Sequence, residues 1–179
     1  MWPRWEVFKK DNARKPYQAV GSVHAVDPEH ALLNAKNVFV RRPSAVSLWV
    51  APASAIFAKT AQELAQEPLN PQSHVGNIMT FQIFRKSSHS RSMTFVDHVG
   101  EVSAADPESA LVQAIETFNN KPGLGWWVIP ADAIFASEDG VEDGWFEPAK
   151  TKTYRSQAEY GFKEKKARKA EKISRAKKQ

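Results

Sequence analysis

The chain has 179 residues, 42% of them hydrophobic, which is enough for one mid-sized domain or two small ones with a hydrophobic core. Cysteine is absent, which excludes disulfides, thiolate metal sites and cysteine nucleophiles. The N-terminal residues contain no apolar signal-peptide core, and no stretch approaches a membrane span. We therefore expect a soluble, cytoplasmic protein with no membrane partner.

The formal net charge of +5 is unevenly distributed. Residues 149–179 hold 12 Lys/Arg and 3 Glu, a balance of +9, and the rest of the chain is mildly acidic at −4. Basic tails are usually solvated or contact partners, and they rarely form part of a fold. We expect a basic C-terminal tail whose residues 160–178 face solvent and are at most loosely helical.

The sequence contains an internal repeat. Three blocks recur in the same order and at nearly the same spacing: 5–10 with 81–86, 21–32 with 100–111, and 49–58 with 127–136. The spacing drifts by only a few residues over the three blocks, so chance is a poor explanation. The chain therefore carries one unit twice.

The first copy is predicted to be strand, strand, helix, strand. Short apolar runs rich in β-formers indicate strands over 5–10, 17–24 and 46–51. The helix opens at Asp27-Pro28, because Asp is a favoured N-cap and Pro is favoured at the first helical position. An apolar stripe at helical spacing follows.

The second copy repeats this order with strands over 79–86, 94–103 and 125–129, and with a helix that opens at Asp106-Pro107. Both third strands are apolar on both faces, and one helix can cover only one face of a sheet. The other face of each sheet is expected to pack on the other copy. The predicted fold is thus α+β, with two tandem units forming a pseudo-two-fold body of antiparallel sheets.

A short helix is predicted between the copies, because Thr60-Ala61-Gln62-Glu63 has the pattern of a capping box. The expected organisation is a first unit over 1–59, a linker with this helix over 60–78, a second unit over 79–137, and a C-terminal segment over 138–179. Within the last segment, residues 145–149 and 152–155 are interpreted as an extended anchor strip followed by the basic tail.

No constellation of catalytic or metal-binding residues is visible. None of the five histidines has a Glu three residues before it, so the paired Glu-x-x-His ligands of carboxylate di-iron sites are missing. There is also no His-Glu-x-x-His zinc helix and no glycine-rich phosphate loop. We expect no catalytic residue, no metal and no cofactor in this chain.

Partner contacts are the remaining candidates for function. His24 has Ser103 at its repeat position, so a structural histidine is preferred over a ligand. Arg41-Arg42 follows the first helix, where cations are favoured in any case, and the sharper interpretation is an anion or partner contact made by one copy only. Trp49, Trp126 and Trp127 lie in apolar strands and are expected in the core or between the copies. The predicted partner contacts are Trp2, His24, Arg41, Arg42, Trp145, Phe146, Pro148, Tyr154 and Arg155.

Six motifs follow one another along the chain: Trp2-Pro3-x-Trp5-Glu6-Val7-Phe8, Gly21-Ser22-x-His24-Ala25, Ala31-Leu32-x-Asn34-Ala35-Lys36, Arg41-Arg42, Ser47-Leu48-Trp49-Val50, and Phe146-x-Pro148-Ala149-x-x-Lys152-x-Tyr154-Arg155. In this order they resemble a known family, the B subunits of bacterial phenylacetyl-CoA epoxidases. A usual member resembles one copy followed directly by the last motif. Here a second copy without the Gly-Ser, His and Arg-Arg features stands between them, as in a fused pseudo-dimer.

The resemblance implies a non-catalytic, bridging subunit of a complex that epoxidises phenylacetyl-CoA in aerobic aromatic catabolism. It implies a di-iron oxygenase subunit and its structural companion as partners, with a reductase as a further candidate. Two other functions stay open. One is a small α+β ligand binder or enzyme that uses the face between the copies, and the other is a nucleic-acid-associated protein that acts through the basic tail.

Overall fold

The computed structural model describes residues 1–40, 45–67, 69, 77–89, 94–118, 120, 123–137 and 142–150. The first copy runs β1 (Arg4–Lys10), β2 (Gln18–His24), α1 (Pro28–Phe39), β3 (Ser47–Pro52), a 3₁₀ turn η1 (Ala53–Ala55) and β4 (Phe57–Thr60), and α2 (Ala61–Gln66) follows. The second copy runs β5 (Met79–Lys86), β6 (Asp97–Ala104), α3 (Pro107–Thr117), β7 (Gly125–Pro130), η2 (Ala131–Ala133) and β8 (Phe135–Ala136), and α4 (Glu142–Lys150) follows. The α+β class and the repeated element order are confirmed.

The helix starts follow from their capping residues. Asp27 and Asp106 accept hydrogen bonds from the backbone N–H groups of His30 and Ser109, and Pro occupies the first turn of both helices. The predicted capping box of α2 is also present, with Thr60 and Glu63 bonded reciprocally. None of the helices in the described part of the chain is long and apolar enough to cross a membrane.

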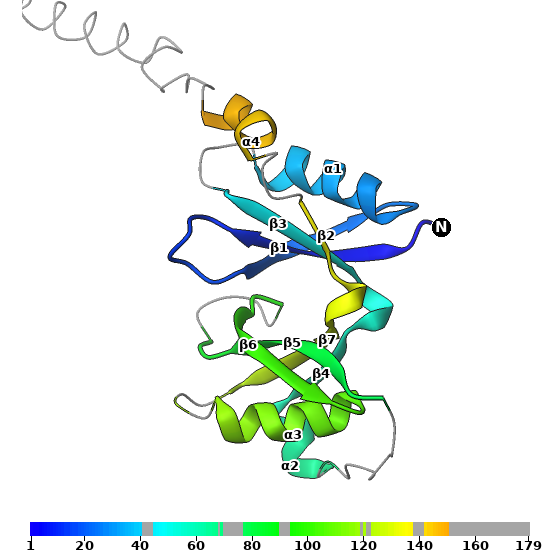
Figure 1. The fold of residues 1–179 in the computed structure, drawn as a ribbon. Coiled ribbons are helices and arrows are strands. Elements are labelled where there is room, and N and C mark those ends of the chain that lie inside the picture. Colours follow the sequence, from blue (N-terminus) through cyan, green and yellow to red (C-terminus); the bar gives the residue numbers. More distant parts are fainter. Residues whose placement is uncertain are drawn as a thin grey trace, which may run out of the picture.

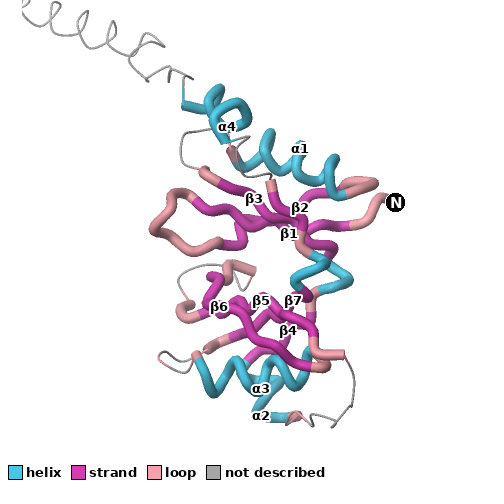
Figure 2. The backbone as a smooth tube through the Cα atoms, in the orientation of Figure 1, coloured by secondary structure: helices cyan, strands magenta, loops and turns pink. Residues whose placement is uncertain are grey.

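The molecule is built in four layers (Figures 1 and 2). Two antiparallel groups of strands face each other, with α1 and α4 on one outer side and α2 and α3 on the other. The strand order is β4-β7-β5-β6-β2-β1-β3-β8, formally an eight-stranded sheet. Its two halves are joined at the β2–β6 edge by a single paired position, Gln18 with Asp97, and the Gln18 side-chain amide also donates to the Asp97 carboxylate at 2.6 Å.

Each copy gives its last strand to the other copy's sheet. β4 of the first copy pairs with β7, and β8 of the second copy pairs with β3. The sequence predicted three strands per copy, and this fourth, exchanged strand was missed. The predicted units over 1–59 and 79–137 describe the repeat in the sequence, and as structural domains they remain a prediction. Each packed half contains a strand from the other range.

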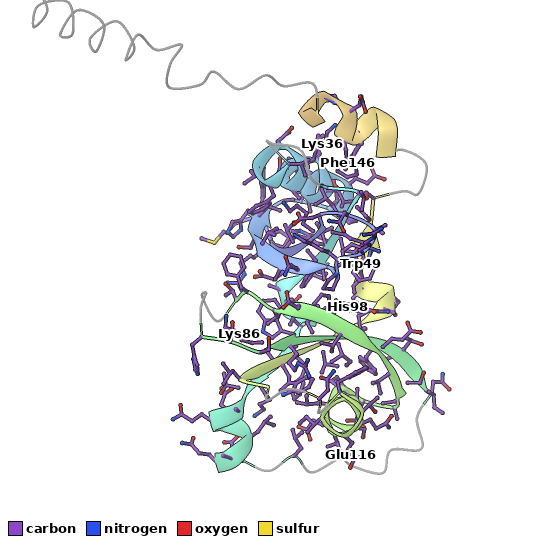
Figure 3. All side chains as sticks on the ribbon, turned by 90° about the vertical axis from the view of Figure 1, so that its left-hand side faces the viewer. Lys36, Trp49, Lys86, His98, Glu116 and Phe146 are labelled. Carbon is purple, nitrogen blue, oxygen red and sulfur yellow. The ribbon has the colours of Figure 1, made fainter. Side chains whose placement is uncertain are left out.

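Three clusters of buried apolar side chains hold the layers together. The first outer cluster lies between α1 and the first sheet, which is the half with the order β2-β1-β3-β8. The second outer cluster lies between α3 and the second sheet, which is the half with the order β4-β7-β5-β6. The central cluster lies between the two sheets and includes Phe8 and Phe84, both fully buried with ring centroids 4.3 Å apart. Trp49 and Trp127 pack against the central cluster, as predicted, and Figure 3 shows Trp49 between the layers. The expected packing of copy on copy is confirmed.

Two repeated glycines shape the sheets at equivalent positions. Gly21 and Gly100 have φ angles of 144° and 152°, and each lies at a register shift of its hairpin. A Cβ at Gly21 would lie 2.9 Å from the Phe39 ring, and one at Gly100 would lie 2.6 Å from the Phe118 ring. Glycine is required at both places because the φ angle and the aromatic ring both exclude a side chain.

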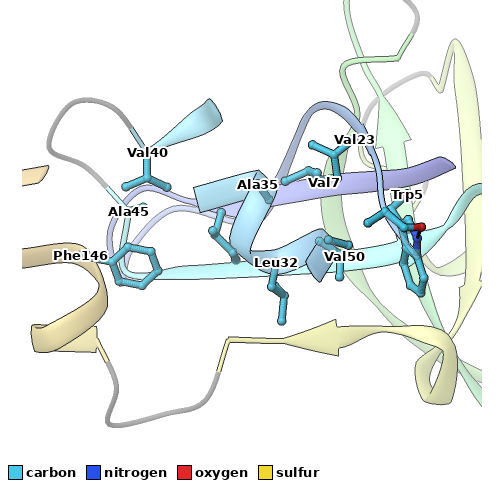
Figure 4. Close-up of a cluster of buried hydrophobic side chains, with 12 residues drawn as sticks. Trp5, Val7, Val23, Leu32, Ala35, Val40, Ala45, Val50 and Phe146 are labelled. Atoms are coloured by element: carbon cyan, nitrogen blue, oxygen red, sulfur yellow. Dashed lines mark hydrogen bonds between the residues drawn. The ribbon is translucent and has the colours of Figure 1, made fainter. Parts of the chain in front are cut away.

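The C-terminal segment differs from the sequence prediction. Residues 142–150 form helix α4, so the expected extended strip over 145–149 is wrong. Its Phe146 is only 2% exposed and belongs to the first outer cluster (Figure 4). α4 follows the exchanged strand β8 as α2 follows the exchanged strand β4, so the segment does have a counterpart after the first copy. Phe146 is buried while Glu147 and Pro148 are exposed, which is the one-sided burial of an amphipathic surface helix.

Candidate partner-binding surface

The N-terminal segment is fixed on the start of α1. The His24 ring nitrogen Nδ1 lies 3.1 Å from the Trp2 carbonyl oxygen, and the Asn34 side-chain amide donates to the His24 carbonyl at 3.3 Å. The Trp2 ring meets His30 edge-on, with centroids 5.4 Å apart, and remains 55% exposed. His24 therefore positions the segment that presents Trp2, a large, well-placed aromatic side chain at the surface.

Helix α4 supplies a second aromatic group on the same side of the molecule. The Lys36 ammonium of α1 lies 4.8 Å from the centroid of the Trp145 ring, a distance suited to a cation–π contact. Phe146 is buried beneath the helix, whereas Pro148 is exposed. Of the expected contacts in this helix, Trp145 and Pro148 are thus accessible at least in part, and Phe146 anchors the helix to the core.

A groove opens between α1, β8 and α4. Its volume is about 600 Å³, and its lining is mostly apolar: Pro28, Glu29, Leu32, Ile134, Phe135, Ala136, Ser137 and Trp145. Phe135 is 40% exposed there, and its ring meets Trp5 edge-on at 6.0 Å. Ser137 is buried, and its hydroxyl accepts from the Leu48 N–H at 3.1 Å. The groove combines residues from both copies, because β8 has crossed to the first sheet.

The exposed apolar side chains favour the first copy. On α1 and just before it, Val26, Leu33 and Val38 are 58%, 48% and 54% exposed. Their repeat positions in the second copy are Ala105, Val112 and Thr117, where Val112 is half-buried. The second copy exposes Ile78 and Met79 at the start of β5. The outer face of α1 is therefore the more apolar of the two helix faces.

The face between the sheets also contains polar groups, but these are paired. Burial raises the pKa of the Glu6 carboxyl above its ordinary value, and the Arg4 guanidinium, 3.1 Å away, offsets this rise only in part. Burial lowers the pKa of the His98 imidazole, whose Nε2 lies 2.7 Å from the Gln82 side-chain oxygen. A cavity of about 270 Å³ borders Arg4, Glu6 and Trp127. With its polar groups paired and rings filling its centre, this face offers a binder or enzyme little free functional chemistry.

Among the residues that the structure describes, no group of three or more His, Cys, Asp or Glu side chains is placed to hold a metal ion. Of the predicted contacts, Arg41, Arg42, Tyr154 and Arg155 lie outside the described residues, as does the basic tail. Sequence reasoning did not find the groove residues Leu32 and Phe135. The only signal for Phe135 was its place in the repeated block 134–136, which matches 56–58.

The comparisons with known proteins agree with the motifs. The family model described as phenylacetic acid degradation B (PaaB) matches residues 1–74 and 77–167, one stretch for each copy. The B subunit of the 1,2-phenylacetyl-CoA epoxidase of Escherichia coli strain K12 is 40% identical over 62 residues, which are 35% of this chain and 65% of that relative. The chain thus matches slightly less than two thirds of the relative's length. No solved structure matches the chain. Because the family model covers nearly the whole sequence, the chain belongs to the phenylacetic acid degradation B family.

Proposed function

We propose that this chain is a non-catalytic, bridging subunit of a multicomponent di-iron oxygenase that acts on phenylacetyl-CoA. The observation that carries the proposal is the family match over both copies. The relative's name supports it further, since that protein is a subunit of a phenylacetyl-CoA epoxidase. The proposed partners are the di-iron subunit and its structural companion, with the reductase as a further candidate, and the proposed location is the cytoplasm.

The bridging role is supported by where the chain places its accessible aromatic groups. Trp2 meets His30 and Trp145 meets Lys36, and both partners are residues of α1. The exposed apolar residues Val26, Leu33 and Val38 lie on the same helix or just before it. Aromatic residues and Arg commonly dominate the energy of protein interfaces. We expect the main docking surface on the first copy, with Arg41, Arg42, Tyr154 and Arg155 contributing to it.

The test is co-purification with the di-iron and companion subunits encoded in the same organism. The wild-type chain should elute with them as one complex on size-exclusion chromatography, with iron in the di-iron subunit and none in the isolated chain by elemental analysis. Stoichiometric iron in the isolated chain, or separate elution of all components, would overturn the proposal.

A matched pair of variants tests the location of the surface. Trp2→Ala should weaken the complex by about 30-fold, because a truncated aromatic anchor typically costs about 2 kcal/mol of binding free energy. The control is Ile78→Ala, which removes an exposed apolar side chain at the repeat position in the second copy. Equal losses in the two variants would contradict docking through the first copy.

A further inference from the structure

The groove beside α1 is an incomplete version of a packed region in the other half. In the second half the chain runs from β4 directly into α2, and Phe57, Leu64 and Leu69 pack against the second outer cluster. In the first half α4 begins only at Glu142, and its anchor Phe146 lies near Val40 and Ala45, away from the first turn of α1 (Figure 4). Among the residues that the structure describes, none therefore covers the first turns of α1 and the strand β8 as the α2 segment covers the other half.

The exposures of equivalent residues agree with this difference. Leu111 in the second copy is fully buried, whereas its counterpart Leu32 is 9% exposed and points from α1 toward β8 (Figure 4). Phe57 is half-buried, whereas its counterpart Phe135 is 40% exposed. The groove of about 600 Å³ is the space left between them. An apolar space of this kind favours an occupant with aliphatic side chains.

The chemistry of the rim restricts the occupant further. Among the described residues that line the groove, Glu29 is the only charged one, and it is exposed. An occupant with a Lys or Arg side chain opposite Glu29 would gain a complementary charge at the rim of the interface. The internal example is a helical segment, since α2 fills the corresponding place with Leu64 and the following Leu69.

We propose that this groove receives an amphipathic helical segment of the oxygenase partner, which carries two aliphatic side chains and a Lys or Arg that faces Glu29. The segment takes the place over α1 and β8 that α2 takes over α3 and β4. This inference rests on the proposed function and adds to it one docking groove and the kind of segment that enters it.

Two variants with matched controls test the groove. Phe135→Lys places an ammonium among the apolar side chains of the groove, because Phe135 lies on the α1 face of its strand, opposite Val50. Glu29→Arg reverses the charge of the rim. The controls are Met79→Lys, which changes an apolar side chain of similar exposure (41%) at the start of β5, and Glu108→Arg, at the repeat position of Glu29. Affinity for the purified di-iron and companion subunits of the same organism is measured by biolayer interferometry, with circular dichroism and urea unfolding as checks of folding.

Phe135→Lys is expected to weaken binding at least tenfold, since a charge buried against apolar groups is unfavourable. Glu29→Arg is expected to weaken it about threefold to tenfold, mainly through slower association. Both controls should bind like the wild type. Binding unchanged in Phe135→Lys and Glu29→Arg, with the wild type bound normally, would overturn the groove and leave the proposed function standing.

A photo-crosslinking amino acid at position 135 identifies the occupant. A cross-link to a partner peptide of helical pattern with Leu, Ile or Phe and a Lys or Arg supports the proposal. A cross-link to a second copy of this chain, or to residues 151–179 of the same chain, would overturn it. Absence of any binding by the wild-type chain would overturn the proposed function, and the groove as its docking site with it.

Discussion

The two halves of the molecule share a core but differ at the surface. Each half has the same strands, an Asp-Pro helix start, a glycine at the bulge and an exchanged strand. The second half is completed by α2, a short helix that follows β4 at once. The first half has α4, farther along the chain, and beside it an open groove, an exposed Trp2 and an apolar α1 face.

Under the proposed function, this difference separates folding from recognition. The features that both copies keep are the cores, the helix starts and the glycine bulges, where a change would disturb the fold. The features that only one copy has are at the surface: His24 with Trp2, Lys36 with Trp145, and the groove. Under the proposed function, duplication within one chain leaves one half to stabilise the body while the other half presents the docking surface. Variants at equivalent positions can show how far the halves are equivalent.

The largest effect is expected at the centre, where the halves meet. Phe8→Ala and Phe84→Ala should each lower the free energy of unfolding by about 3 to 5 kcal/mol, because each removes a fully buried ring. The two losses should be similar, and the double variant should lose less than their sum, since the rings contact each other. Urea unfolding followed by tryptophan fluorescence measures all three.

One cooperative transition is expected throughout, because the exchanged strands tie the halves together. Two separate transitions in either single variant would show that the halves unfold independently, contrary to this comparison.

The anchors of the two added helices should differ. Phe146→Ala is expected to cost about 3 kcal/mol of unfolding free energy, since Phe146 is 2% exposed within the first outer cluster. Leu64→Ala, its nearest counterpart in α2, should cost about 1 to 2 kcal/mol, because Leu64 is only partly buried. The measurement is urea unfolding of the isolated chain. A loss below about 0.5 kcal/mol for Phe146→Ala, the size of an ordinary surface change, would mean that α4 is not part of the folded body without a partner.

The repeated glycines should respond alike. Gly21→Ala and Gly100→Ala are each expected to lose about 2 kcal/mol, because an alanine there adopts a strained φ angle and displaces the ring of Phe39 or Phe118. Gly144→Ala is the control, since nothing lies within 4 Å of its added Cβ and alanine favours the helix α4. Thermal unfolding compares the three variants. A stabilised Gly100→Ala protein would contradict the ring-on-glycine packing.

The repeat made much of the fold predictable from sequence. The strand over 79–86 matches β5 in both bounds, and the other strands of the two hairpins and the third strands differ by one to three residues. Asp-Pro and the capping box located the helix starts because their signals are local. The strand exchange was not predictable from local pattern, since β4 and β8 are short and nothing in them indicates which sheet they join. The extended interpretation of residues 145–149 failed because helix α4 is short and includes Pro148, so the local sequence has no clear helix signal.

The candidate surface was predictable only where it depends on single residues. Trp2 and Trp145 were selected as large aromatics outside the repeated blocks, and the structure places both beside α1. The groove depends on Leu32 and Phe135, which come from different copies and meet only because β8 crosses to the first sheet. Phe146 was assigned to the surface because no sequence signal showed that a core lies beneath it.

The smallest effect should be a pH dependence that belongs to the second copy alone. His98 lies at the repeat position of Ala19, and its ring contacts Tyr17 and Trp49 of the first copy and Phe84 of its own. Burial lowers its pKa below the ordinary value of 6.5, and Lys10 acts in the same direction, whereas Glu101 opposes it. The folded protein therefore binds this proton less readily than the unfolded chain does.

The sign of the effect follows from this difference. Above pH 6.5 His98 is neutral in both states and has no effect on the pH dependence of stability. As the pH falls below 6.5, the unfolded chain takes up the proton first, and the free energy of unfolding decreases until the lower folded pKa is passed. Urea unfolding between pH 8 and 5 should show this decrease in the wild type, and His98→Gln should flatten it while Gln82 keeps a polar neighbour. Glu6, whose pKa is raised from 4.5, changes stability with pH in the opposite sense, in a window that begins at that lower value. A wild-type slope that persists unchanged in His98→Gln would place the titrating group elsewhere and remove this distinction between the halves.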